Sequence, residues 1–357
     1  MSFNFKNSRL LRITISFLIL SVFFCYFYTW EQIPTFISNP TIPQSSETTT
    51  SINGPSSISV PSKPSTSDTH PTTPASSVYT LPDKIWHSAK FDNLSQNQRE
   101  WTGSWTKENP SLRQELLTDR SAEAFVHARY SKTRPDIVEV YEALSIPILR
   151  ADLFRYLVVL AEGGIWGDLD ASCEKDVTEW VPLEYRNENI DMIVGLEFDF
   201  EWRGPGTEVA SQFCNWVFVA RKSSRNLQII VDTVVNKLKS IAQENSVGIE
   251  GITLEMLSDV VKVTGPKIMT IAILDSLGQL LGRTVDDRDY AHIKQPKLVG
   301  DVLIMPGAAF AALQNGNPTD QGDVLVTHHY EGSWKKEDAE AKERKKQKEK
   351  QAQQQQQ

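Results

Sequence analysis

The sequence predicts an α/β domain with a mainly parallel sheet between about Leu81 and Trp334. Short apolar runs typical of buried strands alternate there with longer segments whose apolar residues recur at helical spacing. Glycines and cap residues separate the two kinds of segment, as the Gly163-Gly164 pair does. A single domain is enough to hold this pattern.

The elements follow in order along the chain. Lys84–His87 is predicted to be a first short strand, and Ser121–Tyr130 a helix with Ser121 as its cap. Apolar runs predict four later strands, at residues 190–196, 215–220, 302–305 and 324–326. A helix is predicted from Arg225 to about Gln243, because apolar residues line one side of it: Leu227, Ile230, Val234 and Leu238.

The most informative segment is residues 151–170, ADLFRYLVVLAEGGIWGDLD. Asp152 and Arg155 lie three apart in its helical part and can therefore face one cleft. After the glycine pair, strand alternation places Asp168 and Asp170 on one face, with Leu169 turned the other way. Two hard oxygen donors at a strand end predict a site for Mg²⁺ or Mn²⁺.

The alternative for a bare Asp-x-Asp is a pair of solvated acids. The acid and arginine upstream, together with Trp166 two residues before Asp168, favour a metal-dependent sugar-nucleotide site instead. Residues 324–326 would also carry His328 and His329 to a strand end, where ligands of open α/β sheets bind. Either histidine could add a metal ligand or could be an ordinary hydrogen-bonded histidine, and His329 is slightly favoured.

A second polar group follows the strand predicted at residues 190–196. Glu197, Asp199 and Gln212 could position an acceptor hydroxyl. An acidic surface loop is an equally good interpretation, because most charged residues are exposed.

The two ends of the chain lie outside the predicted core. Residues 13–30 form an apolar run with a basic flank, which predicts a transmembrane anchor rather than a cleaved signal peptide. The positive flank places residues 1–12 in the cytoplasm and everything after the anchor in a lumen, a type II orientation. Residues 31–80 are predicted to be a Ser/Thr/Pro-rich stem, residues 81–334 the catalytic domain, and residues 335–357 a disordered charged and glutamine-rich tail.

Composition limits the remaining possibilities. The formal net charge of −8 gives no support for nucleic-acid binding. Cys173 and Cys214 are too few for a disulfide framework, and whether they pair is open. Asn93-Leu94-Ser95 is an N-glycosylation sequon, which a luminal domain could use.

Several segments together resemble glycosyltransferase family 32, whose members contain a DXD sugar-binding region. The matching residues span nearly all of the predicted domain: 81–90 (LPDKIWHSAK), 150–156 (RADLFRY), 163–170 (GGIWGDLD), 264–266 (TGP) and 328–335 (HHYEGSWK). The resemblance implies a GT-A fold, with a Rossmann-like mixed sheet flanked by helices, and a retaining transfer from a nucleotide sugar.

The resemblance also implies roles for individual residues. Asp152 and Arg155 would hold the donor sugar and a phosphate, Trp166 would flank the nucleotide, Asp168 would contact ribose and metal, and Asp170 would chelate the ion. Other donor-binding residues implied are Trp86 and His87 at the base, Gly265 in the 264–266 turn, and Ser333 and Trp334 over the diphosphate.

Substrate and setting are implied by the same resemblance. It points to mannose transfer from GDP-mannose to an N-linked glycan in the Golgi membrane, forming an α-1,6 linkage. Alternatives within the family are a subunit of a mannan-polymerase complex and an inositol-phosphoceramide mannosyltransferase. A non-catalytic sugar-binding subunit of such a complex is the alternative from another class, and the intact acids argue against it.

Overall fold

The computed structural model describes residues 83–200, 209–312 and 322–332, with residues 339–340, 343–344 and 346–347 of the C-terminal segment. All of them belong to one compact unit, Thr72–Gln357. The predicted anchor at residues 13–30 and the stem at 31–80 lie outside the described residues. Within the described part, no helix has the length and hydropathy that crossing a membrane requires.

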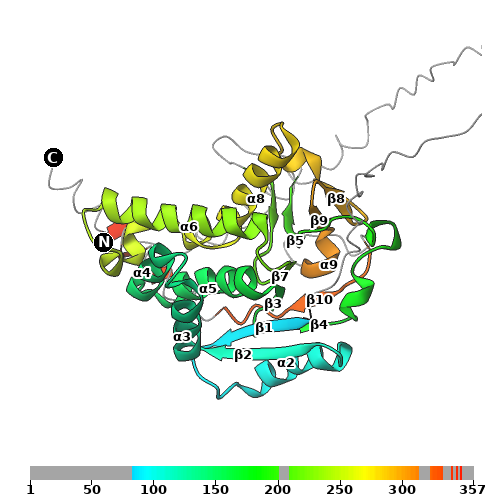
Figure 1. The fold of residues 1–357 in the computed structure, drawn as a ribbon, viewed down its shortest axis with the longest axis horizontal. Coiled ribbons are helices and arrows are strands. Elements are labelled where there is room, and N and C mark those ends of the chain that lie inside the picture. Colours follow the sequence, from blue (N-terminus) through cyan, green and yellow to red (C-terminus); the bar gives the residue numbers. More distant parts are fainter. Residues whose placement is uncertain are drawn as a thin grey trace, which may run out of the picture. The chain divides into compact units, whose positions relative to one another are not determined.

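An eight-stranded mixed sheet lies at the centre of this unit (Figure 1). Its strand order is β2-β1-β3-β7-β5-β9-β8, and β6 pairs with β5 beside this path. The strands are β1 (Lys84–Ala89), β2 (Arg113–Thr118), β3 (Gly164–Gly167), β5 (Met192–Asp199), β6 (Ser211–Phe213), β7 (Val217–Ala220), β8 (Lys297–Val299) and β9 (Val302–Met305).

The sheet is less parallel than the alternating pattern predicted. Strand β1 is parallel to β2 and β3, and β5 is parallel to β9. The other pairs are antiparallel. Parallel neighbours need a long crossover, usually a helix, and none of the described residues between β3 and β7 forms an α-helix.

A small second sheet pairs β4 (Ala171–Cys173) antiparallel with β10 (Val326–His328). The α-helices of the described part are α2 (Gln96–Glu108), α3 (Asp119–Tyr130), α4 (Pro135–Ala143), α5 (Pro147–Glu162), α6 (Arg225–Glu244), α7 (Val260–Val263), α8 (Pro266–Leu281) and α9 (Gly307–Ala311). Helix α3 begins earlier than predicted, because Thr118 is its cap and Ser121 is the third helical residue of a capping box.

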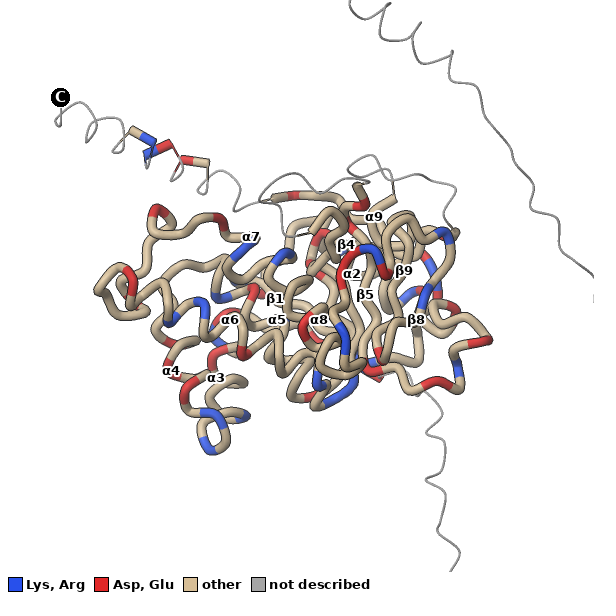
Figure 2. The backbone as a smooth tube through the Cα atoms, turned by 90° about the horizontal axis from the view of Figure 1, so that it is seen from above, with Lys and Arg blue, Asp and Glu red and all other residues tan. Residues whose placement is uncertain are grey.

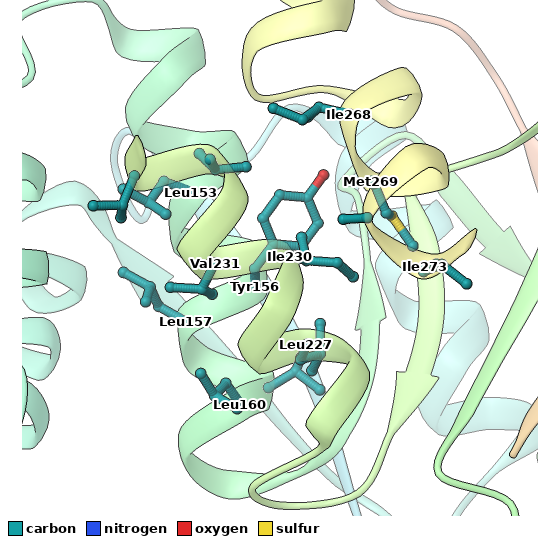
Figure 3. Packing of buried hydrophobic residues seen from close by; sticks show 14 of the residues in the cluster. Leu153, Tyr156, Leu157, Leu160, Leu227, Ile230, Val231, Ile268, Met269 and Ile273 are labelled. Carbon is teal, nitrogen blue, oxygen red and sulfur yellow. The ribbon is translucent and has the colours of Figure 1, made fainter. Parts of the chain in front are cut away.

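The two faces of the sheet bury different cores, as the alternation of side chains along a strand requires. Strand β7 shows the division: Phe218 packs in one cluster with α3–α6 and α8, whereas Val217 and Val219 pack in the other with α9, β4 and β10. Figure 3 shows the first core, where residues of α5, α6 and α8 interlock. The labelled side chains are Leu153, Tyr156, Leu157, Leu160, Leu227, Ile230, Val231, Ile268, Met269 and Ile273.

Charged residues lie interspersed along the helices that cover this core. Figure 2 shows acidic and basic positions on α3 and α6, whereas α4 carries acidic positions alone. Several form exposed ion pairs, such as Arg150 with Glu123 at 2.5 Å. Pairs of this kind contribute little to stability, about 0 to 1 kcal/mol each, so the buried clusters carry most of the fold's free energy.

Candidate active site

A cavity of about 400 Å³ opens where several elements end. This volume lies within the usual range of small-molecule sites, about 300–1,000 Å³. Its walls come from the start of α5, the turn after β3, the β5–β6 pair, the α7–α8 junction and the segment after β10. Polar lining residues include Asp152, Arg155, Asp168, Asp170, Glu197, Gln212, Asn215, His328 and Glu331, and apolar ones include Ile148, Trp166, Phe198, Trp216, Val260, Val261 and Pro266.

The glycine pair ends helix α5 as predicted and directs the chain into β3. Gly163 has φ +70° and Gly164 has φ +131°, values that side-chain-bearing residues rarely adopt. A Cβ on Gly164 would lie 2.5 Å from Trp86 Nε1, and that nitrogen donates to the Gly163 carbonyl at 2.8 Å. Strand β3 therefore begins in close contact with β1.

The two acids of Asp168-Leu169-Asp170 lie in a turn, which corrects the predicted strand geometry. Strand β3 ends at Gly167, and the Ala171 amide then donates to the Asp168 carbonyl at 3.1 Å. Asp168, Leu169 and Asp170 all line the cavity. Strand alternation does not apply within a turn, and the acids converge because the chain reverses there.

Arg155 ties the helix and the turn together. Its Nη2 lies 2.8 Å from Asp152 Oδ1, and its Nη1 donates to the Asn215 carbonyl at 2.8 Å and to Asp168 Oδ2 at 3.4 Å. Asp152 also accepts from Thr264 Oγ1 at 2.8 Å. The predicted pair on α5 thus faces the predicted acids across one cavity.

Burial and charge set the pKa values of this group. Burial raises the pKa of Asp152 against the lowering effects of Arg155 and Thr264. Burial also raises the pKa of Asp168 to about 6, since the opposing effect of Arg155 is smaller and Asp170 adds like-charge repulsion. Burial lowers the pKa of Arg155, but the charges of Asp168 and Asp152 outweigh it and leave that pKa raised.

His328, rather than the slightly favoured His329, lies beside Asp170. His328 Nε2 is 3.3 Å from Asp170 Oδ1, and His328 lines the cavity. Burial acts to raise the pKa of Asp170, but the hydrogen bond and charge of His328 lower it on balance. His329 instead stacks on Trp101 at 4.3 Å and hydrogen-bonds Ser172 Oγ at 2.9 Å, because neighbouring side chains point to opposite faces.

Trp86 and His87 were expected at a nucleotide base, but neither of them lines this cavity. Trp86 packs against Phe125 in the core. Both ring nitrogens of His87 have partners, the Gly167 carbonyl at 2.6 Å and Gln114 Nε2 at 2.8 Å. Burial lowers the pKa of His87 to about 4, so it is a neutral core histidine. Ser88, the residue after His87 in β1, lines the cavity.

The remaining donor residues fall in three groups. Trp166 lines the cavity and donates to Asp168 Oδ1 at 2.7 Å. Gly265 also lines it, and its lack of a side chain is needed because a Cβ would lie 2.8 Å from Val261 Cα. Ser333 and Trp334 lie outside the described residues, so their expected role stays a prediction.

Of the three predicted acceptor residues, Glu197 and Gln212 line the cavity and Asp199 does not. Glu197 is buried at the cavity and accepts from Gln212 Nε2 at 3.0 Å. Asp199 lies outside the cavity lining and holds structure together, accepting from Ser211 Oγ at 2.8 Å and from the His292 amide at 2.9 Å. Asp199 is therefore a local structural acid, and its expected acceptor role is not supported.

Asn215 and Trp216 are functional candidates that sequence reasoning missed. Asn215 Nδ2 donates to Asp152 Oδ1 at 3.3 Å, and the Trp216 carbonyl accepts from the Asp168 amide at 2.8 Å. Both residues immediately precede β7, which runs antiparallel to β3. The start of β7 therefore meets the end of β3. Asn215 and Trp216 could have been predicted at the site only by predicting this strand pairing.

The cavity carries an excess of negative charge. Five carboxylates line it among the described residues, from Asp152, Asp168, Asp170, Glu197 and Glu331, against Arg155 and His328. A bound anionic diphosphate would need a further cation. Carboxylate donors suit Mn²⁺ or Mg²⁺, and an imidazole beside them favours the transition ion Mn²⁺. The donor chemistry fits a divalent ion at Asp168, Asp170 and His328, although no ready-made group of three ligands occurs within the described part.

The structure also describes the predicted glycosylation site and the two cysteines. Asn93 is exposed, just before Ser95, the cap of α2. Cys173 and Cys214 are both buried and free, so they do not pair. Burial raises the pKa of the Cys173 thiol to about 11.

Comparison with known proteins agrees with this geometry. Residues 95–187 match the model of a glycosyltransferase sugar-binding region containing a DXD motif, a range that includes Asp152, Arg155, Asp168 and Asp170. The initiation-specific α-1,6-mannosyltransferase of Schizosaccharomyces pombe is 32% identical over 71% of this chain. The chain covers 64% of that relative, a little under two thirds of its length.

Two relatives from Saccharomyces cerevisiae are also similar. The putative glycosyltransferase HOC1 is 27% identical over 74% of this chain and 68% of its own length. The mannosyl phosphorylinositol ceramide synthase SUR1 is 28% identical over 27% of this chain and 24% of its own length. The motifs, the cavity around them and these matches together make the chain similar to transferases of glycosyltransferase family 32, and residues 95–187 match a sugar-binding region that contains a DXD motif.

Proposed function

We propose that this protein is a metal-dependent mannosyltransferase that moves mannose from GDP-mannose to an N-linked glycan and forms an α-1,6 linkage. One observation carries the proposal: Asp152, Arg155, Asp168 and Asp170 line a single cavity with His328. The name of the initiation-specific α-1,6-mannosyltransferases among the relatives supplies the sugar and the linkage.

A divalent ion held by Asp168, Asp170 and His328 would supply Lewis-acid stabilisation of charge on the leaving diphosphate. Arg155 supplies a fixed positive charge for the same purpose, and burial strengthens its effect. Asp152, oriented by Arg155, Asn215 and Thr264, is placed to accept hydrogen bonds from donor sugar hydroxyls. Trp166 supplies an apolar wall for the nucleotide.

We infer transfer with retention of configuration. The acceptor hydroxyl would attack from the face that the diphosphate leaves, and the departing phosphate would take the acceptor proton. Glu197 and Gln212 are placed to orient that hydroxyl, since both line the cavity and bond to each other. No covalent intermediate is required for this route.

The proposed setting is the Golgi membrane, with one type II anchor at residues 13–30 and the domain in the lumen. The apolar run with its basic flank supports the anchor, and the sequon at Asn93 supports a luminal domain. The exposed position of Asn93 is compatible with glycan attachment. Within a complex, other mannosyltransferases are the proposed partners.

The alternative within the family is transfer to a lipid acceptor or action as a mannan-polymerase subunit. Similarity to the ceramide synthase supports the lipid alternative but covers only about a quarter of the chain, at 27%. A non-catalytic sugar-binding subunit is disfavoured because the charged residues expected of an active site are all present. Arg155 contacts Asp152 and Asp168, and His328 contacts Asp170.

The test is transfer or hydrolysis by the full chain with a panel of nucleotide sugars, with and without Mn²⁺. We expect GDP-mannose turnover that depends on Mn²⁺ and falls by at least about 100-fold in Asp170→Ala, because a charge-stabilising group would be lost. Glu188→Ala, which removes an exposed acid outside the cavity, is the matched control and should keep full activity.

The same assay, repeated with different acceptors, shows which acceptor receives the sugar. Mannose transfer to an N-glycan oligosaccharide but not to inositol-phosphoceramide would support the leading proposal. The reverse result would favour the lipid alternative. Undiminished turnover in Asp170→Ala would contradict the metal assignment.

A further inference from the structure

Two tryptophans stack on the two neighbouring histidines in almost the same geometry. Trp216 and His328 have ring centroids 4.3 Å apart with 6° between planes, and Trp101 and His329 are 4.3 Å apart with 9°. Only the first pair lines the cavity. Trp101 can therefore serve as an internal control for Trp216, because it makes the same stacking contact with a histidine outside the cavity.

The Trp216 ring is fixed in place by its surroundings. Its residue is 5% exposed, and the Tyr330 ring meets its edge at 5.4 Å. His328 lies against both rings, with Tyr330 at 3.8 Å. Tyr330 adopts φ +51°, a left-handed conformation that a side-chain-bearing residue rarely takes, so the backbone is held there by the surrounding contacts.

Through these contacts Trp216 reaches both acids of the DXD turn. Its ring supports His328, whose Nε2 is 3.3 Å from Asp170 Oδ1. Its carbonyl accepts from the Asp168 amide at 2.8 Å. The backbone contact does not depend on the side chain, whereas the support of His328 depends on the ring face alone.

Simple volume filling does not explain this residue well. Trp216 Nε1 is buried and has no hydrogen-bond partner among the described residues, a cost that an apolar side chain would avoid. The aromatic face is the feature that the site uses. An indole stacked flat on an imidazole fixes the ring plane and so the direction of the nitrogen that faces Asp170.

We propose that Trp216 is a positioning residue that orients His328 toward the divalent ion of this site. The inference rests on the proposed metal-dependent function and adds a residue to it. Supporting groups behind a metal ligand typically change metal affinity about 10- to 100-fold when they are removed. The effect of Trp216 on metal binding should therefore pass through His328 and through no other ligand.

The test measures Mn²⁺ affinity of the full chain by isothermal titration calorimetry, with thermal unfolding followed in parallel. We expect Trp216→Leu to weaken Mn²⁺ binding about tenfold, which is about 1.4 kcal/mol. Trp216→Phe keeps an aromatic face and should stay within about threefold of the wild type. Trp101→Leu removes the equivalent stack on His329 and should leave Mn²⁺ affinity unchanged.

A double-mutant cycle shows whether the effect passes through His328. In a His328→Ala background, adding Trp216→Leu should cause no further loss of Mn²⁺ affinity. Should Trp216→Leu fail to fold, Trp216→Met takes its place, since its unbranched, flexible side chain adapts better to the same space without a ring face.

The outcomes separate the two proposals. If the wild type binds no Mn²⁺, the metal-dependent function itself fails. If the wild type binds Mn²⁺ but Trp216→Leu binds it equally well, or if Trp101→Leu is weakened to the same degree, only the role of Trp216 is overturned. A further loss of affinity in the His328→Ala background overturns it as well.

Discussion

At the scale of residues, one guanidinium connects elements that are distant in sequence. Arg155 contacts Asp152 on its own helix, Asp168 in the turn after β3, and the carbonyl of Asn215 before β7. A lysine would have to reach all three partners from one nitrogen, whereas the planar guanidinium uses two nitrogens that lie in a fixed fork. The identity of this residue as arginine thus follows from geometry as well as charge.

His87 provides a pH prediction for the fold. The folded protein keeps this histidine neutral, because burial lowers its pKa to about 4. The unfolded chain takes up a proton below its ordinary pKa of 6.5, so the free energy of unfolding should decrease as pH falls from about 6.5 to 4. The contribution of His87 to this loss is up to about 3 kcal/mol.

Urea denaturation at pH 7, 6 and 5 measures this effect. His87→Gln should be less stable at pH 7 and should show a smaller loss on acidification than the wild type. His127→Gln, which changes an exposed histidine on α3, is the control and should follow the wild-type curve. An unchanged pH dependence in His87→Gln would exclude His87 as its source.

The sequence predicted that Asp152 and Arg155 would face the same cavity as the two acids of the DXD segment, and the structure places them so. It did not predict the hydrogen-bond partners of these residues. Asp152 and Arg155 followed from helical spacing, which is a local property. The core packing of Trp86 and His87 and the position of Trp216 were not predicted, because their surroundings depend on which strands become neighbours. Residues from β1, β3 and β7 meet only through sheet pairing.

At the scale of elements, the junction between α5 and β3 sets the position of the acidic turn. Gly164 combines a φ of +131° with a Cβ position 2.5 Å from Trp86 Nε1. Gly164→Ala should therefore lower the free energy of unfolding by about 3 kcal/mol or more, since backbone strain and overpacking both contribute. Chemical denaturation of the purified variant measures this change.

Gly103 is the matched glycine for that experiment. It lies inside α2, and a Cβ there would meet no atom within 4 Å. Gly103→Ala should raise stability by about 0.5–1 kcal/mol, because alanine favours the helix. Equal effects of the two substitutions would contradict the role given to the α5–β3 junction.

Element predictions were accurate where a periodic pattern was long or a strand was fully buried. Helix α6 spans Arg225–Glu244 against a predicted Arg225–Gln243, and β9 spans the predicted residues 302–305. The DXD segment was taken as continuous strand because apolar and polar residues alternate there. A turn can carry the same alternation, and the local sequence does not distinguish the two.

At the scale of the whole molecule, ligand binding should be visible as stability. Mn²⁺ and GDP together should raise the melting temperature of the full chain by more than the sum of their separate effects, because a diphosphate enters this acidic cavity favourably only with a cation. At about 100 times Kd, binding stabilises by about 2.7 kcal/mol, or roughly 5 °C or more for a domain of this size.

Differential scanning calorimetry on the full chain and on Asp170→Ala provides the measurement. The variant should lose the joint effect while unfolding in a single cooperative transition, and Glu188→Ala should keep it. A rise with GDP alone, equal to that with both ligands, would show that nucleotide binding does not need the ion.

All strands of the central sheet precede residue 306, whereas β10 and the histidine beside Asp170 follow it. During synthesis the sheet can be assembled while the cavity still lacks one wall. A chain stopped before β10 would have all strands of the central sheet but would lack part of the second core and one wall of the cavity, so binding depends on a segment synthesised after that sheet.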